Sequence, residues 1–152
     1  MQKTKGDLFE CEPKSGWVVI STNVGWTRDG SNVMGAGLAK TAAMRWPNLP
    51  VDYGAWCQKF GGKMFVSKKN RVICLPSKPL NKVQPWASWR SNSCPDLIRE
   101  SYRQLKDWAL KNPKETVKLA PFGAQNGKLP MDMALKLVED ACFPDNVVLV
   151  LR

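Results

Sequence analysis

The chain has 152 residues, of which 43% are hydrophobic and 24% are charged, and its formal net charge is +10. This length and composition fit one globular domain, residues 1–152, and exclude wholesale disorder. There is no histidine, and the five cysteines are scattered without a C-x-x-C pair, which excludes Ser-His-Asp and Cys-His catalysis, zinc ribbons and disulfide scaffolds.

The first half of the chain alternates between strand and helix patterns. Residues 17–21 form a short continuous apolar run, which is typical of a strand buried on both faces. A stretch rich in glycine, asparagine and serine follows. Beyond it we expect two helices, the first of which ends before Pro47, and then two strands. These four elements are expected at residues 38–46, 51–60, 64–66 and 72–75.

The second half continues the alternation. Ser93 followed by Asp96 resembles a capping box, with Pro95 tolerated in the first turn, and the helix after it places its apolar residues on one face. A strand, a helix and a final buried strand are then expected at residues 117–122, 131–142 and 147–151. Strands that alternate with helices predict an α/β layered domain.

Two glycine-rich loops each follow a predicted strand directly and precede a predicted helix. Gly35 and Gly37 lie in the first loop, and the second covers residues 120–130. Glycine lets backbone N–H groups approach an anion at a helix N-terminus. The first loop is a poor dinucleotide fingerprint, because Lys40 stands where a small residue is needed, and neither loop is a Walker A motif. Two such loops at the carboxyl ends of strands suit a diphosphate.

Basic residues concentrate in the middle of the chain, where residues 61–120 hold 13 Lys and Arg against 4 Asp and Glu. This excess suggests a nucleic acid or a phosphate-bearing ligand as partner, and a solvated basic surface is the alternative. No apolar run approaches the ~20 residues of a membrane-spanning helix, and the start lacks a signal-peptide pattern. We expect reduced thiols, no membrane, no metal, no cofactor, and a cytoplasmic location (host cytoplasm for a viral protein).

A series of short motifs extends over nearly the whole chain. In order they are GDLF at residues 6–9, VMGAGLA at 33–39, RWP at 45–47, LPSK at 75–78 and PFGAQNG at 121–127. This order resembles the macrodomain family, the ADP-ribose-binding fold. It is most similar to the branch that contains the DarG antitoxin macrodomains and the glutamate-ADP-ribose hydrolases. The resemblance implies a three-layer α/β/α fold around a central mixed, largely parallel sheet.

The resemblance also implies a role for individual residues. Asp7 would hold the adenine amine beside the backbone of Leu8, and Asn23 would lie near the distal ribose. Lys78 would act at the anomeric carbon, which requires that its amine spend time uncharged. The diphosphate would lie between the two loops, held by Gly35, Ala36 and Gly37 on one side and by Gly123, Ala124, Gln125, Asn126 and Gly127 on the other.

The chain departs from the family's pattern next to this site. The second loop carries no acid, whereas the glutamate-directed relatives have a catalytic one there. Gln125 and Pro130 stand where DarG-like loops usually carry glycine and an acid. Residues 24–31 and 79–88 look like insertions, and the second contains Lys82, which competes with Lys78 for the aligned position.

The leading hypothesis is an ADP-ribosyl hydrolase that removes ADP-ribose from modified DNA or protein, with Lys78 central and Asn23 positioning the ribose. The basic segment and the tryptophans would then contact nucleic acid. A phosphatase that acts on ADP-ribose 1″-phosphate (Appr-1-p processing) is an alternative, because some macrodomains with that activity resemble residues 44–47. The missing loop acid favours a third function, a non-catalytic reader or scavenger of ADP-ribose.

Overall fold

Within the residues that the computed structural model describes, 1–9, 16–123 and 127–152, six strands form one sheet in the order β1-β6-β5-β2-β4-β3. Neighbouring strands are parallel except for β3 and β4, which are antiparallel. This confirms the predicted mixed, largely parallel sheet. The strands are β1 (Gln2–Lys5), β2 (Trp17–Asn23), β3 (Phe65–Ser67), β4 (Val72–Lys78), β5 (Val117–Leu119) and β6 (Val147–Leu151).

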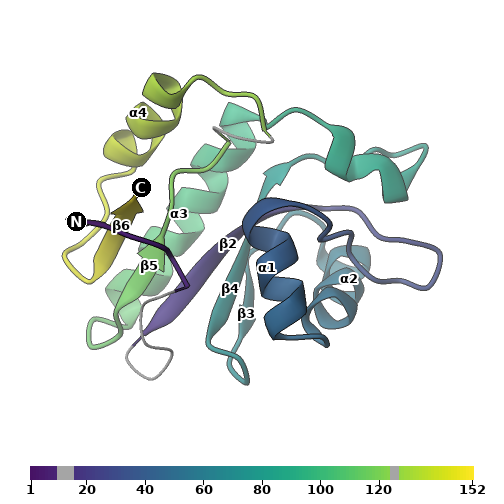
Figure 1. Cartoon of the computed structure of the whole chain (residues 1–152), viewed down its shortest axis with the longest axis horizontal. Helices are drawn as coiled ribbons and strands as arrows, with labels where there is room; N and C mark the ends of the chain where they lie inside the picture. Colours follow the sequence, from purple (N-terminus) through teal and green to yellow (C-terminus); the bar gives the residue numbers. More distant parts are fainter. Residues whose placement is uncertain (10–15, 124–126) are drawn as a thin grey trace.

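Helices cover both faces of this sheet (Figure 1). One face carries α1 (Gly37–Arg45) and α2 (Leu49–Phe60), and the other carries α3 (Pro95–Lys111) and α4 (Met131–Ala141). A 3₁₀ helix, η1 (Pro85–Arg90), follows β4. The arrangement is the expected three-layer α/β/α fold.

Alternate residues of each central strand enter two separate cores. In β2, Trp17 and Val19 pack on the side of α3 and α4, whereas Val18 and Ile20 pack on the side of α1 and α2. Successive side chains of a strand point to opposite faces of its sheet, so a strand covered on both faces needs an apolar residue at every position. This requirement explains the continuous apolar run that predicted β2.

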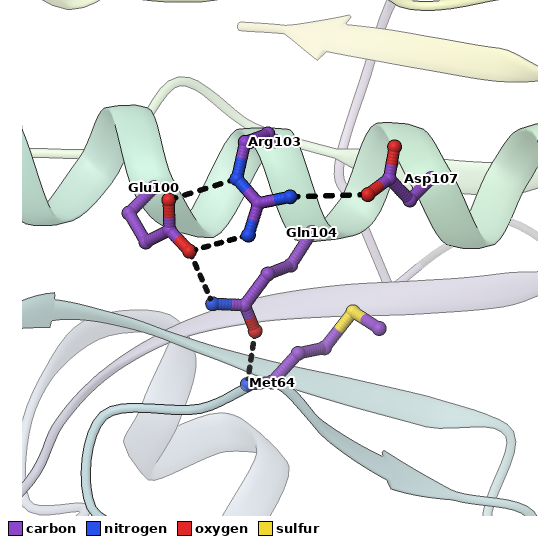
Figure 2. A network of polar contacts seen from close by, with 5 residues as sticks. All are labelled: Met64, Glu100, Arg103, Gln104 and Asp107. Atoms are coloured by element: carbon purple, nitrogen blue, oxygen red, sulfur yellow. Dashed lines mark hydrogen bonds and ion pairs between the residues drawn. The ribbon is translucent and has the colours of Figure 1, made fainter.

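A ladder of polar side chains runs along the exposed face of α3. Arg103 pairs with Glu100 at 2.6 Å and with Asp107 at 3.2 Å, and its hydrogen bonds lower the pKa of Glu100 to about 2. Figure 2 shows how Gln104 joins this ladder to the chain before β3, accepting a hydrogen bond from the Met64 N–H at 2.8 Å. A polar contact therefore supplements the apolar packing of α3 on the sheet.

The fifth strand is shorter than the sequence predicts. It ends at Leu119 instead of reaching Phe122. Pro121 has no N–H to donate to a ladder, and the Phe122 N–H donates at 3.1 Å to the Tyr102 hydroxyl on α3. The chain therefore leaves the sheet soon after β5 begins.

The predicted capping box at Ser93 is wrong. The N-cap of α3 is Cys94, and no side chain caps the helix. Ser93 is instead buried against the second glycine loop, and its N–H donates to the Gly127 carbonyl at 3.1 Å. Neither the 3₁₀ helix η1 nor strand β1 had a predicted position, whereas the other elements begin and end within a few residues of their expected positions.

Two further expectations concern the described residues. The cysteines among them, Cys57, Cys74, Cys94 and Cys142, have free thiols. None of the helices in the same residues has the length and apolar character needed to cross a membrane.

Candidate functional site

The predicted site residues follow strands whose carboxyl ends share one edge of the sheet. Asp7 follows β1, the first glycine loop follows β2, Lys78 ends β4, and the second loop follows β5. These strands are all parallel members of the same sheet. The topology therefore brings the described candidates to one edge, where α/β folds bind their ligands.

Lys78 and Asn23 are register partners at the ends of β4 and β2, where a bulge shifts the pairing. Lys78 Nζ donates a hydrogen bond to the carbonyl oxygen of Trp89 in η1 at 2.9 Å. Burial lowers the pKa of Lys78, and the nearby charge of Lys128 lowers it further. The amine is therefore neutral more often than that of an ordinary surface lysine. Lys82 is exposed in the loop beyond β4.

Asn23 is buried, and its side-chain amide organises the loop that follows it. Nδ2 donates to the Val33 carbonyl at 2.8 Å. Oδ1 accepts from the Gly25 N–H at 2.9 Å and from Asn32 Nδ2 at 3.1 Å. Asn32 Nδ2 also lies 2.7 Å from the Gly25 carbonyl. These bonds fix the path of the chain as it leaves β2, and they use only one of the two N–H groups of Asn23 Nδ2.

The first glycine loop ends at a helix N-terminus without a side-chain cap. Ala36 is the N-cap of α1, and the first turn carries no acidic residue. Gly37 has a φ of 58°, which favours glycine. A Cβ at Gly35 would meet only the Val33 side chain, at 3.9 Å. The backbone donors at this N-terminus are exposed and can bind an anion such as a phosphate.

The described part of the second loop is tightly packed. A Cβ on Gly123 would lie 2.6 Å from Leu129 Cδ1, and one on Gly127 would lie 1.9 Å from Ser93 Oγ. The Leu129 N–H donates to the Gly123 carbonyl at 2.7 Å. Close packing against the Gly123 backbone therefore requires glycine at 127, and a φ of 90° favours glycine at 123. Three other predicted ligand-binding residues lie outside the described residues: Ala124, Gln125 and Asn126.

Hydroxyl groups from neighbouring helices hold the strand ends in place, and sequence reasoning missed them. Thr22 Oγ1 donates to the buried Tyr53 hydroxyl of α2 at 2.6 Å. Ser101 Oγ of α3 donates to the Pro76 carbonyl at 2.6 Å, just before Lys78. Their signal in the sequence was weak, because polar residues on the buried face of a helix resemble ordinary core residues.

Two buried polar atoms in the described part of the chain have no hydrogen-bond partner, Asn32 Oδ1 and Ser93 Oγ. Asn32 belongs to the first glycine loop. Ser93 Oγ faces Gly127 of the second loop. Buried polar side chains are rarely left unpaired, so each of these atoms retains hydrogen-bonding capacity beside a glycine loop.

Asp7 lies at the β1 end of the edge. One of its carboxylate oxygens accepts a hydrogen bond from the Phe9 N–H at 2.8 Å, and Leu8 between them is buried. In the order β1-β6-β5-β2-β4, four strand spacings of about 4.8 Å each separate β1 from β4, or roughly 19 Å. Asp7 and Lys78 therefore lie near opposite ends of a long edge.

A hollow of about 570 Å³ lies near the Lys78 end. This hollow is formed by the two insertions together with α2. Its lining residues are Trp26, Thr27, Arg28, Gly30, Gln58, Pro85 and Trp86.

The chain matches no protein-family model and no curated protein, but its structure is similar to solved macrodomain structures. With the macrodomain of Mycobacterium tuberculosis DarG, the TM-score is 0.77 at 23% identity, over 99% of this chain and 97% of that one. The macrodomain of Thermus aquaticus DarG gives 0.74 at 22% identity, over 99% and 97%. Thermosipho africanus DarTG in complex with ADP-ribose gives 0.70 at 18% identity, over 99% and 42%. This chain therefore has the macrodomain fold, as its motifs predicted.

Proposed function

We propose that this chain binds ADP-ribose along the carboxyl edge of its sheet and hydrolyses the linkage between ADP-ribose and a modified DNA or protein. Lys78 is the proposed catalytic residue, and Asn23 positions the terminal ribose. The observation that carries the proposal is the pairing of these residues on adjacent strands, beside the exposed backbone donors of the first loop. The solved complex of a structural neighbour with ADP-ribose supports the choice of ligand.

Each part of ADP-ribose has a corresponding feature along this edge. Asp7 at the β1 end accepts a hydrogen bond from the adenine amine. The backbone donors of the two glycine loops hold the diphosphate between them. The terminal ribose then lies near β4, next to Lys78. The roughly 19 Å from β1 to β4 suits an extended ligand of this kind, and the net charge of +10 favours a diphosphate.

The proposed nucleophile is the neutral amine of Lys78, which the lowered pKa makes more abundant. In its neutral form the amine attacks the anomeric carbon, and the modified group leaves with the electron pair of the broken bond and takes up the proton that Nζ loses. Water then attacks the same carbon, the carbon–nitrogen bond breaks, and one proton of the water passes to the departing amine. The Trp89 carbonyl accepts one N–H of Nζ, which orients the amine while its lone pair remains available.

The test compares Lys78→Ala with Lys82→Ala, a matched change on an exposed lysine of the following loop. ADP-ribose release is measured from an ADP-ribosylated oligonucleotide and from an ADP-ribosylated protein. Loss of a positioned catalytic group lowers turnover by about 10²-fold or more, so we expect that loss for Lys78→Ala and wild-type activity for Lys82→Ala. Equal activity of Lys78→Ala and the wild type would remove Lys78 from the mechanism.

Two other outcomes select the alternative functions. Phosphate release from ADP-ribose 1″-phosphate that Lys78→Ala does not diminish selects the phosphatase. ADP-ribose binding by calorimetry without turnover of any linkage selects the non-catalytic reader. The absence of an acidic residue from positions 121–131 makes this reader the main competitor.

A further inference from the structure

We propose that the hollow between residues 24–31 and η1 is a second ligand site, which takes one nucleobase of a single-stranded nucleic acid. The base would belong to a nucleotide next to the ADP-ribosylated one. The inference rests on the proposed function and names the class of substrate that reaches Lys78.

Two tryptophans from separate segments line the hollow, Trp26 and Trp86. Trp86 is 52% exposed. Among the described residues, no aromatic ring and no cation contacts either indole. Every other tryptophan of the chain has such a partner: Trp17, Trp46, Trp56, Trp89 and Trp108. The two indoles without such a partner are therefore the two that line this hollow: Trp86 is exposed, and Trp26 is half-buried against the core beneath α1 and α2.

Hydrogen bonds and close contacts fix the walls of the hollow before any ligand binds. A Cβ on Gly25 would lie 2.0 Å from the Pro85 carbonyl oxygen, so the two insertions touch. Ser88 Oγ donates to the Pro85 carbonyl at 2.8 Å and accepts from the Asn81 N–H at 2.9 Å. The Gly30 carbonyl accepts from Gln58 Nε2 of α2 at 3.3 Å. Walls held by such contacts lower the entropic cost of binding a planar ring.

Hydrogen bonds connect the segments on both sides of the hollow to the candidate catalytic residues. On one side, the Gly25 N–H next to Trp26 donates to Asn23 Oδ1. On the other, Trp86 shares η1 with Trp89, whose carbonyl accepts the hydrogen bond from Lys78 Nζ. The hollow is therefore joined to both candidate catalytic residues through short stretches of chain, three residues of η1 on one side and three residues after β2 on the other.

The charges around the hollow favour a nucleic acid over an acidic peptide. Arg28 lines it, and Arg90 is exposed at the end of η1. Asp29 is the acid nearby, and its carboxylate accepts from the Ser31 N–H at 3.0 Å and from the Thr27 hydroxyl. Cations bind phosphates and carboxylates alike, but available indole faces specifically favour a planar base. A base reaches them only when it is unstacked, which means in a single strand.

The test measures binding of Trp86→Ala and Trp26→Ala to an oligothymidylate of about ten nucleotides. The matched control is Val83→Ala, an apolar side chain of the same insertion that is 86% exposed and does not line the hollow. Loss of one stacked base weakens binding about 5- to 140-fold, so we expect that loss for Trp86→Ala and none for Val83→Ala. Binding of an abasic oligomer of equal length and of free ADP-ribose should not change.

The result that overturns the inference is equal oligothymidylate binding by the wild type and both tryptophan variants. An equal loss on the abasic oligomer or on polyglutamate would also overturn it, because stacking would then not be the interaction that was removed. Weaker ADP-ribose binding by Trp86→Ala would show that the hollow belongs to the ADP-ribose site. Failure of the wild type to bind ADP-ribose would refute the proposed function. Oligothymidylate binding by the wild type and the tryptophan variants tests the hollow independently of that result.

Discussion

Replacing Asn23 with alanine tests whether its amide builds the first glycine loop. The substitution removes the acceptor of the buried Gly25 N–H and the donor to the half-buried Val33 carbonyl. Each orphaned group costs about 1–3 kcal/mol, so we expect a loss of about 2–6 kcal/mol in the free energy of unfolding. For a domain of this size that loss lowers Tm by about 4–24 °C.

The control is Asn48→Ala, at the exposed N-cap of α2, where the side chain makes no capping hydrogen bond. Its free energy of unfolding should stay within about 0.5 kcal/mol of the wild type. Urea and thermal unfolding of both variants give the comparison. A loss below about 1 kcal/mol for Asn23→Ala, or one equal to that of Asn48→Ala, would refute the assignment of a loop-building role to this amide.

Two further substitutions test the second loop. Because the positive charge of Lys128 lowers the pKa of Lys78, Lys128→Ala should raise that pKa and move the rising limb of the pH–rate profile to higher pH; an unchanged profile would contradict this. Gly127→Ala places a Cβ 1.9 Å from Ser93 Oγ and should cost about 1–3 kcal/mol of stability. The control Gly62→Ala has no contact closer than 3.6 Å and should unfold like the wild type.

The sequence predicted the layers of the fold well because burial on both faces leaves a strong pattern. The runs at residues 17–21 and 147–151 could be recognised as buried strands without any partner being known. Local patterns failed where a tertiary contact decides the structure. Ser93 fits a capping box by its spacing, but the approach of Gly127 draws it into the second loop.

The candidate site was only partly accessible from the sequence. The glycine loops could be predicted from residue type, whereas the position of Lys78 opposite Asn23 depends on the register of β4 against β2. A bulge sets that register, and the sequence does not show it. The hollow could not be predicted either, because its two tryptophans lie 60 residues apart and meet only through the packing of two insertions.

The most direct test of the account is a crystal structure of the chain with ADP-ribose. We expect the adenine near Asp7, the diphosphate over the N-terminus of α1, and the anomeric carbon next to Lys78 Nζ. An ADP-ribose molecule bound with its terminal ribose away from Lys78, or seated between Trp26 and Trp86, would contradict the account.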